Sequence, residues 1–92
     1  MNPTRRAMIR KAARSLKESA DYLDDTYYLI DVAYEEESDS LDNMPEQFVN
    51  GKKYERAEKI IEALDDFRNH LDVLRDDMCV IRELMEEKIL LL

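Results

Sequence analysis

Apolar residues recur at alternating intervals of four and three through both halves of the chain, and this spacing constrains the fold more than any other feature. The row in the first half is Ile9, Ala13, Leu16, Ala20, Leu23, Tyr27, Ile30 and Tyr34. The row in the second half is Ala57, Ile60, Leu64, Phe67, Leu71, Leu74, Met78, Ile81 and Met85. Such alternation is typical of helices that pack along one another. Each seam row, as we call these two sets, therefore predicts one long α-helix.

The segment between the seam rows is rich in residues that cap helices and form turns. These residues are Ser40, Asp42, Asn43, Pro45, Asn50 and Gly51. We predict a first helix at about 4–38, a hinge at 39–52 and a second helix at about 53–91. Pro45 suits the start of a short helical turn in this hinge, and Gly51 suits its end. The expected fold is a single all-α domain over 1–92, an antiparallel two-helix coiled-coil hairpin.

The sizes of the seam residues suggest how the helices face each other. If residue i lies opposite residue 91 − i, Tyr34 meets Ala57 and Ala20 meets Leu71, so that small side chains meet large ones. This alignment also brings the basic start of the first helix beside acids near the end of the second. We therefore expect ion pairs near the helix ends, which would favour the antiparallel orientation.

Charge is sorted along the chain, whose net charge is −8. Residues 1–17 hold six bases and no acid, whereas residues 18–46 hold eleven acids and no base. Within the first helix this order opposes the helix macrodipole, so either a neighbouring helix or a charged partner must favour it. The net charge disfavours direct binding of nucleic acid or a membrane and makes a basic protein surface the expected partner.

Two candidate surfaces lie outside the seam rows. The acidic face, which is the expected partner-binding surface, comprises Asp21, Tyr22, Asp24, Asp25, Tyr28, Asp31, Glu35 and Glu36. The expected oligomer interface comprises Leu29, Val32, Val73, Val80, Leu84 and Leu91. Because an isolated hairpin would leave these apolar residues in water, we expect a homodimer that forms a four-helix bundle.

Neither a cofactor nor a metal site nor an enzymatic activity is expected. His70 is the only histidine, and Cys79, the only cysteine, has no histidine positioned to activate it. A two-helix hairpin also offers no cleft in which paired carboxylates would acquire different pKa values. The longest purely apolar run covers 89–92, whereas a membrane span needs about 20 residues. We expect a cytoplasmic protein.

The hinge sequence resembles that of a known protein group. Asp42-Asn43-Met44-Pro45-Glu46 is followed by Gly51, Tyr54, Glu55, Ala57 and Glu58, and then by a helix with Ala63-Leu64-Asp65. This pattern is similar to that of small helical-hairpin proteins encoded by phages and prophages, which carry Asp-Asn-Leu/Met-Pro-Glu between two acidic, leucine-rich helices. The resemblance covers roughly 35–75. It implies a mobile-element setting within a bacterial host cell and carries over no catalytic residue.

The combined expectation is a non-enzymatic protein-binding module. In a mobile-element setting, the acidic face suggests an inhibitor of a host defence protein or nucleic-acid-processing protein. The alternative is a self-assembling structural or scaffold component, which would use the apolar surface instead. Of these two functions, the inhibitor is the favoured expectation.

Overall fold

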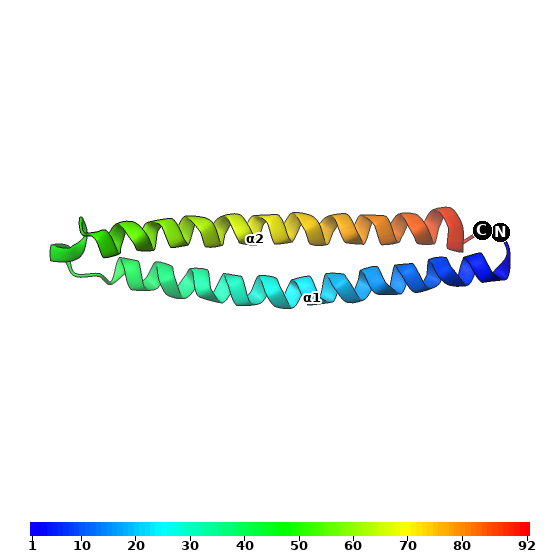
Figure 1. The fold of residues 1–92 in the computed structure, drawn as a ribbon, viewed down its shortest axis with the longest axis horizontal. Helices are drawn as coiled ribbons and strands as arrows, with labels where there is room; N and C mark the ends of the chain where they lie inside the picture. Colours follow the sequence, from blue (N-terminus) through cyan, green and yellow to red (C-terminus); the bar gives the residue numbers. More distant parts are fainter. The chain divides into compact units, whose positions relative to one another are not determined.

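The structure, a computed structural model that describes all 92 residues, contains two long helices and no strand. Helix α1 spans Pro3–Asp42 and helix α2 spans Lys52–Met85. A 3₁₀ helix, η1 (Glu46–Phe48), lies between them, and a π-helical turn, η2 (Glu86–Leu90), follows α2. The predicted all-α two-helix hairpin is confirmed (Figure 1), although α1 continues four residues beyond its expected end.

Two compact units make up the chain, and both helices contribute to each. Unit 1 comprises Met1–Asp25 and Asp72–Leu92, so the start of α1 lies beside the end of α2 and the two termini are neighbours (Figure 1). Unit 2 comprises Thr26–Leu71 and contains the hinge, which makes it a helical hairpin by itself. Each unit therefore has its own helix–helix contact.

Local sequence explains where α1 begins and how the hinge turns. Asn2 caps α1 by accepting a 2.8 Å hydrogen bond from the backbone N–H of Arg5, and Pro3 occupies the first helical position. At the hinge, Pro45 immediately precedes η1, as the predicted short helical turn requires. The N–H of Gly51 donates to the Phe48 carbonyl at 3.0 Å, and a Cβ at Gly51 would lie only 3.3 Å from the same oxygen. Glycine permits this close approach.

The seam row of α1 faces α2 as predicted. All eight of its residues are buried or half-buried. Ala13 and Ala20 are 6% and 7% exposed, and they are the only buried residues of the chain. The core of this hairpin is therefore small.

Only part of the predicted seam row of α2 faces α1. Five members are half-buried as expected: Ala57, Leu64, Leu71, Met78 and Met85. Four are exposed, so their prediction is wrong: Ile60, Phe67, Leu74 and Ile81. The half-buried positions in their place lie one residue later: Ile61, Arg68, Arg75 and Arg82. One residue turns a helix by about 100°, and since the other five seam positions stay in place, the contact face of α2 is turned by about half of that angle toward its arginines.

The predicted helix alignment is also wrong. Arg75 pairs with Asp24 in unit 1 and Arg68 pairs with Asp31 in unit 2, and both pairs of residue numbers add to 99 rather than 91. The ion pairs expected near the helix ends are absent. All five ion pairs of the chain involve Arg68 or Arg75, which lie in the middle of α2. Size matching of apolar residues failed since it left these arginines out of the contact.

The basic start of α1 does interact with the opposite helix end. The Arg6 guanidinium donates to the carbonyls of Ile89 and Leu90, each at 3.2 Å. These carbonyls lie at the end of η2, where the last groups of a helix lack intrahelical partners and carry partial negative charge. Arg6, a basic residue at the start of α1, thus forms hydrogen bonds with the C-terminal end of the antiparallel helix. This contact accounts for part of the basic charge at the start of α1.

Candidate interaction surfaces

Arg75 joins the two helices of unit 1. Its guanidinium contacts Asp24 of α1 at 2.8 Å, and on α2 it contacts Asp76 at 3.3 Å and Asp72 at 3.8 Å. Hydrogen bonding to Asp24, followed by that to Asp76, raises the pKa of Arg75 above its ordinary value. The arginine stays charged, and it neutralises carboxylates that would otherwise repel one another.

Arg68 has the same role in unit 2. It contacts Asp31 of α1 at 2.6 Å and Asp65 of α2 at 2.8 Å, and its guanidinium lies 4.0 Å from the centre of the Tyr34 ring. Hydrogen bonding to Asp31, and then to Asp65, raises the pKa of Arg68. The cation above the aromatic face adds a further attraction across the helix pair.

These ion pairs define two sides of the helix pair. Asp24 and Asp72 lie one residue after seam positions on their helices, and Arg75 draws both to one flank, which we call the polar side. Residues that directly precede the contact positions line the opposite flank, the apolar side. The sequence holds one signal for these two sides: Asp24 and Asp31 are seven residues apart, as are Arg68 and Arg75, so each pair lies on one face of its helix.

The apolar side of unit 1 combines large residues of α2 with small residues of α1. Leu74 and Ile81 are both exposed, whereas Ala12 and Ser19 occupy the corresponding flank of α1. Val73, Val80 and Leu84, which belong to the predicted oligomer interface, are exposed on the neighbouring surface of α2. Leu91, beyond η2, is exposed as well. Large side chains therefore stand beside a flank of small ones.

Unit 2 shows the same arrangement. Ile60 and Phe67 of α2 are exposed, the latter by 53%, whereas Thr26 and Ala33 line the corresponding flank of α1. Two residues of the predicted oligomer interface lie on α1 in this unit. Of these, Leu29 is exposed and Val32 is half-buried.

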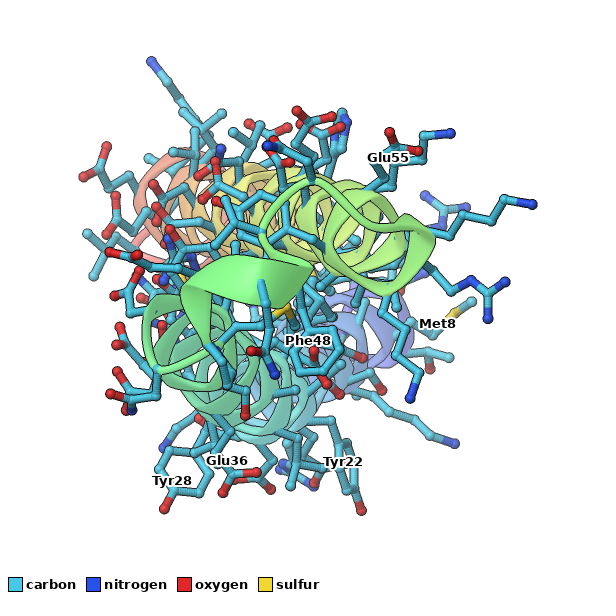
Figure 2. The ribbon with its side chains drawn as sticks, turned by 90° about the vertical axis from the view of Figure 1, so that its left-hand side faces the viewer. Met8, Tyr22, Tyr28, Glu36, Phe48 and Glu55 are labelled. Carbon is cyan, nitrogen blue, oxygen red and sulfur yellow. The ribbon has the colours of Figure 1, made fainter.

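In unit 1, the predicted acidic face is exposed around Tyr22. Tyr22 is 72% exposed, and it lines a shallow hollow of about 240 Å³ together with Glu18, Asp21 and Asp25. Figure 2 shows the Tyr22 ring extending away from the ribbon. Asp24, by contrast, already pairs with Arg75. A basic partner would therefore meet Asp21 and Asp25 more readily than Asp24.

The remaining acidic-face residues lie in unit 2. Tyr28, Glu35 and Glu36 are exposed, and Figure 2 shows Tyr28 and Glu36 extending away from the ribbon. Asp31 is half-buried and pairs with Arg68. Of the predicted acidic residues, Asp24 and Asp31 thus form ion pairs between the two helices.

A hollow of about 330 Å³ lies at the hinge. Its lining combines Met44 and Phe48 with Gly51, Lys52 and Lys53. Phe48 is 51% exposed, and Figure 2 shows its ring near the middle of the view from the hinge end. Sequence reasoning did not anticipate this hollow, because its apolar lining comes from isolated residues within a turn.

No group of three or more histidine, cysteine, aspartate or glutamate side chains is arranged to hold a metal ion. His70 is exposed, and Cys79 is half-buried with a free thiol. Neither helix includes an apolar stretch of the length that crossing a membrane demands.

Comparison with protein-family models, curated proteins and solved structures finds no match for this chain.

Proposed function

We propose that this chain is a non-enzymatic interaction protein that pairs with a second copy of itself through its apolar side. The exposed apolar residues of α2 are the observation that carries the proposal. Leu74 and Ile81 repeat at the seven-residue interval of a coiled-coil contact, yet both are exposed in the single chain. A four-helix bundle would cover them and supply the core that Ala13 and Ala20 alone do not.

Shape supports a second copy as the partner. In a two-fold dimer the same side of both chains meets, so the large residues of one copy face the small residues of the other. Leu74 and Ile81 would pack over Ala12 and Ser19 of the second copy, as dense helix packing requires. The polar side stays in water, where its ion pairs need no desolvation.

We expect the purified chain to form a dimer in solution. Multi-angle light scattering after size-exclusion chromatography should give twice the chain mass of 10.9 kDa. The helical signal in circular dichroism should fall on dilution below the dissociation constant, since folding and association are then linked. A monomer that stays fully helical at every concentration would contradict self-association.

A second candidate function is supported by the surroundings of Tyr22. An exposed aromatic ring among Glu18, Asp21 and Asp25 suits the centre of an interface with a basic protein. In the mobile-element setting suggested by the hinge sequence, that protein would be a host defence or nucleic-acid-processing protein that the chain inhibits. Asp21 and Asp25 do not precede contact positions, so they would remain accessible on a dimer formed through the apolar side, whereas Tyr22, which precedes Leu23, would lie at the edge of that dimer interface.

Charge reversal of Asp21→Lys with Asp25→Lys should remove such a partner. We expect the tagged wild-type chain to capture a basic protein in stoichiometric amount from nuclease-treated bacterial lysate, and we expect the variant to lose it, as judged by mass spectrometry. Glu83→Lys with Glu87→Lys is the matched control, because it reverses two exposed charges on the other side of the hairpin. Equal capture by both variants would contradict the acidic-face function.

A further inference from the structure

A hollow of about 370 Å³ on the polar side of unit 1 gathers four cationic side chains without a carboxylate partner. Its lining comprises Arg10, Ala13, Arg14, Lys17, Arg82, Glu86 and Leu90. All five ion pairs of the chain belong to Arg68 and Arg75, so none involves these four cations. The Arg82 Nε atom is buried and has no hydrogen-bond partner. Twelve of the 14 bases form no ion pair, and four of these twelve are gathered in this one hollow.

Arg82 is the third arginine in a row whose other members are fully paired. Arg68, Arg75 and Arg82 are spaced by seven residues, so they occupy equivalent positions on α2. Arg68 and Arg75 each receive a carboxylate from α1, namely Asp31 and Asp24. Each also has an aspartate three residues earlier on α2.

Arg82 lacks both of these carboxylates because other residues occupy the equivalent positions. Seven residues before Asp24 on α1 stands Lys17, and seven residues after Asp72 on α2 stands Cys79. The aspartate from α1 is thus replaced by a second cation, and the aspartate from α2 by a cysteine. The sequence positions that supply carboxylates to Arg75 are therefore repeated beside Arg82, but neither holds a carboxylate.

We propose that this hollow binds a small phosphoryl anion, such as inorganic phosphate or the phosphate of a small phosphomonoester. Guanidinium groups donate paired hydrogen bonds that match phosphate oxygens, and Lys17 adds a further charged donor. Arg10, Arg14 and Lys17 follow one another at intervals of four and three, so they share one face of α1.

Size and charge favour a small anion over a nucleic acid. The hollow exceeds the roughly 30 Å³ that one water molecule occupies by about twelvefold, so a phosphate group fits. A long polyanion would also meet the net charge of −8 on the rest of the chain. Glu86, the one carboxylate in the lining, limits affinity by repelling the anion. The site is independent of the proposed dimer, because it lies on the opposite side of the helix pair.

Phosphate titrations at constant ionic strength, with chloride as the balancing ion, test this site in the full chain. We expect saturable NMR shifts of the amides around Lys17 and Arg82. A melting-temperature rise of roughly 4 °C or more should follow once phosphate is several times its dissociation constant. Glu86→Gln should tighten binding, and Arg82→Gln should weaken it at least about tenfold.

Lys17→Asp provides the sharpest variant, since it restores the missing carboxylate beside Arg82. Without phosphate this variant should melt at a higher temperature than the wild type, and phosphate should no longer shift its spectrum or its melting temperature. Lys11→Asp makes the same charge change at an exposed position outside the hollow and should keep phosphate affinity within about threefold. Circular dichroism of each variant verifies that it is folded.

Three results would overturn the proposal. One is a phosphate response that does not saturate or that equals the response to chloride. Another is an equal loss of binding in Lys17→Asp and Lys11→Asp. The third comes from a single-stranded oligonucleotide titrated in parallel: shifts of the same amides by the oligonucleotide, without any response to inorganic phosphate, would identify the ligand as nucleic acid.

Discussion

A chain that carries Leu74→Lys and Ile81→Lys is expected to lose self-association. Burial of one large apolar side chain contributes about 1.5–3 kcal/mol, and each substitution would count twice in a two-fold dimer. Lysine also brings an ammonium group that is costly to bury. We therefore expect the dissociation constant to rise at least about a thousandfold, which sedimentation equilibrium can measure.

A variant with Glu83→Gln and Glu87→Gln is the matched control. It changes the net charge by the same +2, but both glutamates are exposed, belong to no ion pair and lie off the apolar side. This control should remain dimeric. If both variants associate as the wild type does, the apolar side is not the interface. If both dissociate, net charge rather than apolar contact controls the assembly.

The Leu74 and Ile81 positions also show how far sequence pattern could reach. Seven-residue periodicity predicted both helices and the whole seam row of α1, because a single narrow apolar row leaves only one face to bury. On α2 the apolar surface is wider than one partner helix covers. Periodicity alone could not decide which part of that surface faces α1.

The ion pairs of Arg68 and Arg75 determine which part of α2 faces α1. Sequence reasoning treated charged residues as exposed, as they usually are. Here Arg68 has two aspartates within reach and Arg75 has three, and each long arginine stem can cross the helix contact while its charge stays partly in water. The acidic face was therefore predicted too broadly, because two of its residues, Asp24 and Asp31, are taken up by these arginines. The basic hollow was missed because Arg82 could be recognised as unpaired only after the pairing of Arg68 and Arg75 was known.

Replacing both paired arginines, by Arg68→Met with Arg75→Met, is expected to destabilise the hairpin strongly. Methionine keeps much of the side-chain volume, so the main loss is electrostatic. Asp24, Asp31 and the aspartates of α2 would then repel one another across and along the helices without a neutralising cation. We expect the melting temperature measured by circular dichroism to fall by several degrees at low salt.

Two measurements separate the loss of ion pairs from a loss of packing: the melting temperature as a function of salt, and the melting temperature of an Arg82→Met variant. Added sodium chloride screens repulsion among the exposed aspartates and weakens the wild-type ion pairs, so the difference in melting temperature should narrow as salt rises. Arg82→Met removes an arginine at the equivalent position that has no carboxylate partner. In the absence of phosphate it should leave the melting temperature unchanged or higher, because it relieves repulsion from Lys17 and Arg14. An equal fall in Arg82→Met would show instead that the arginine stems, rather than their ion pairs, hold α2 against α1.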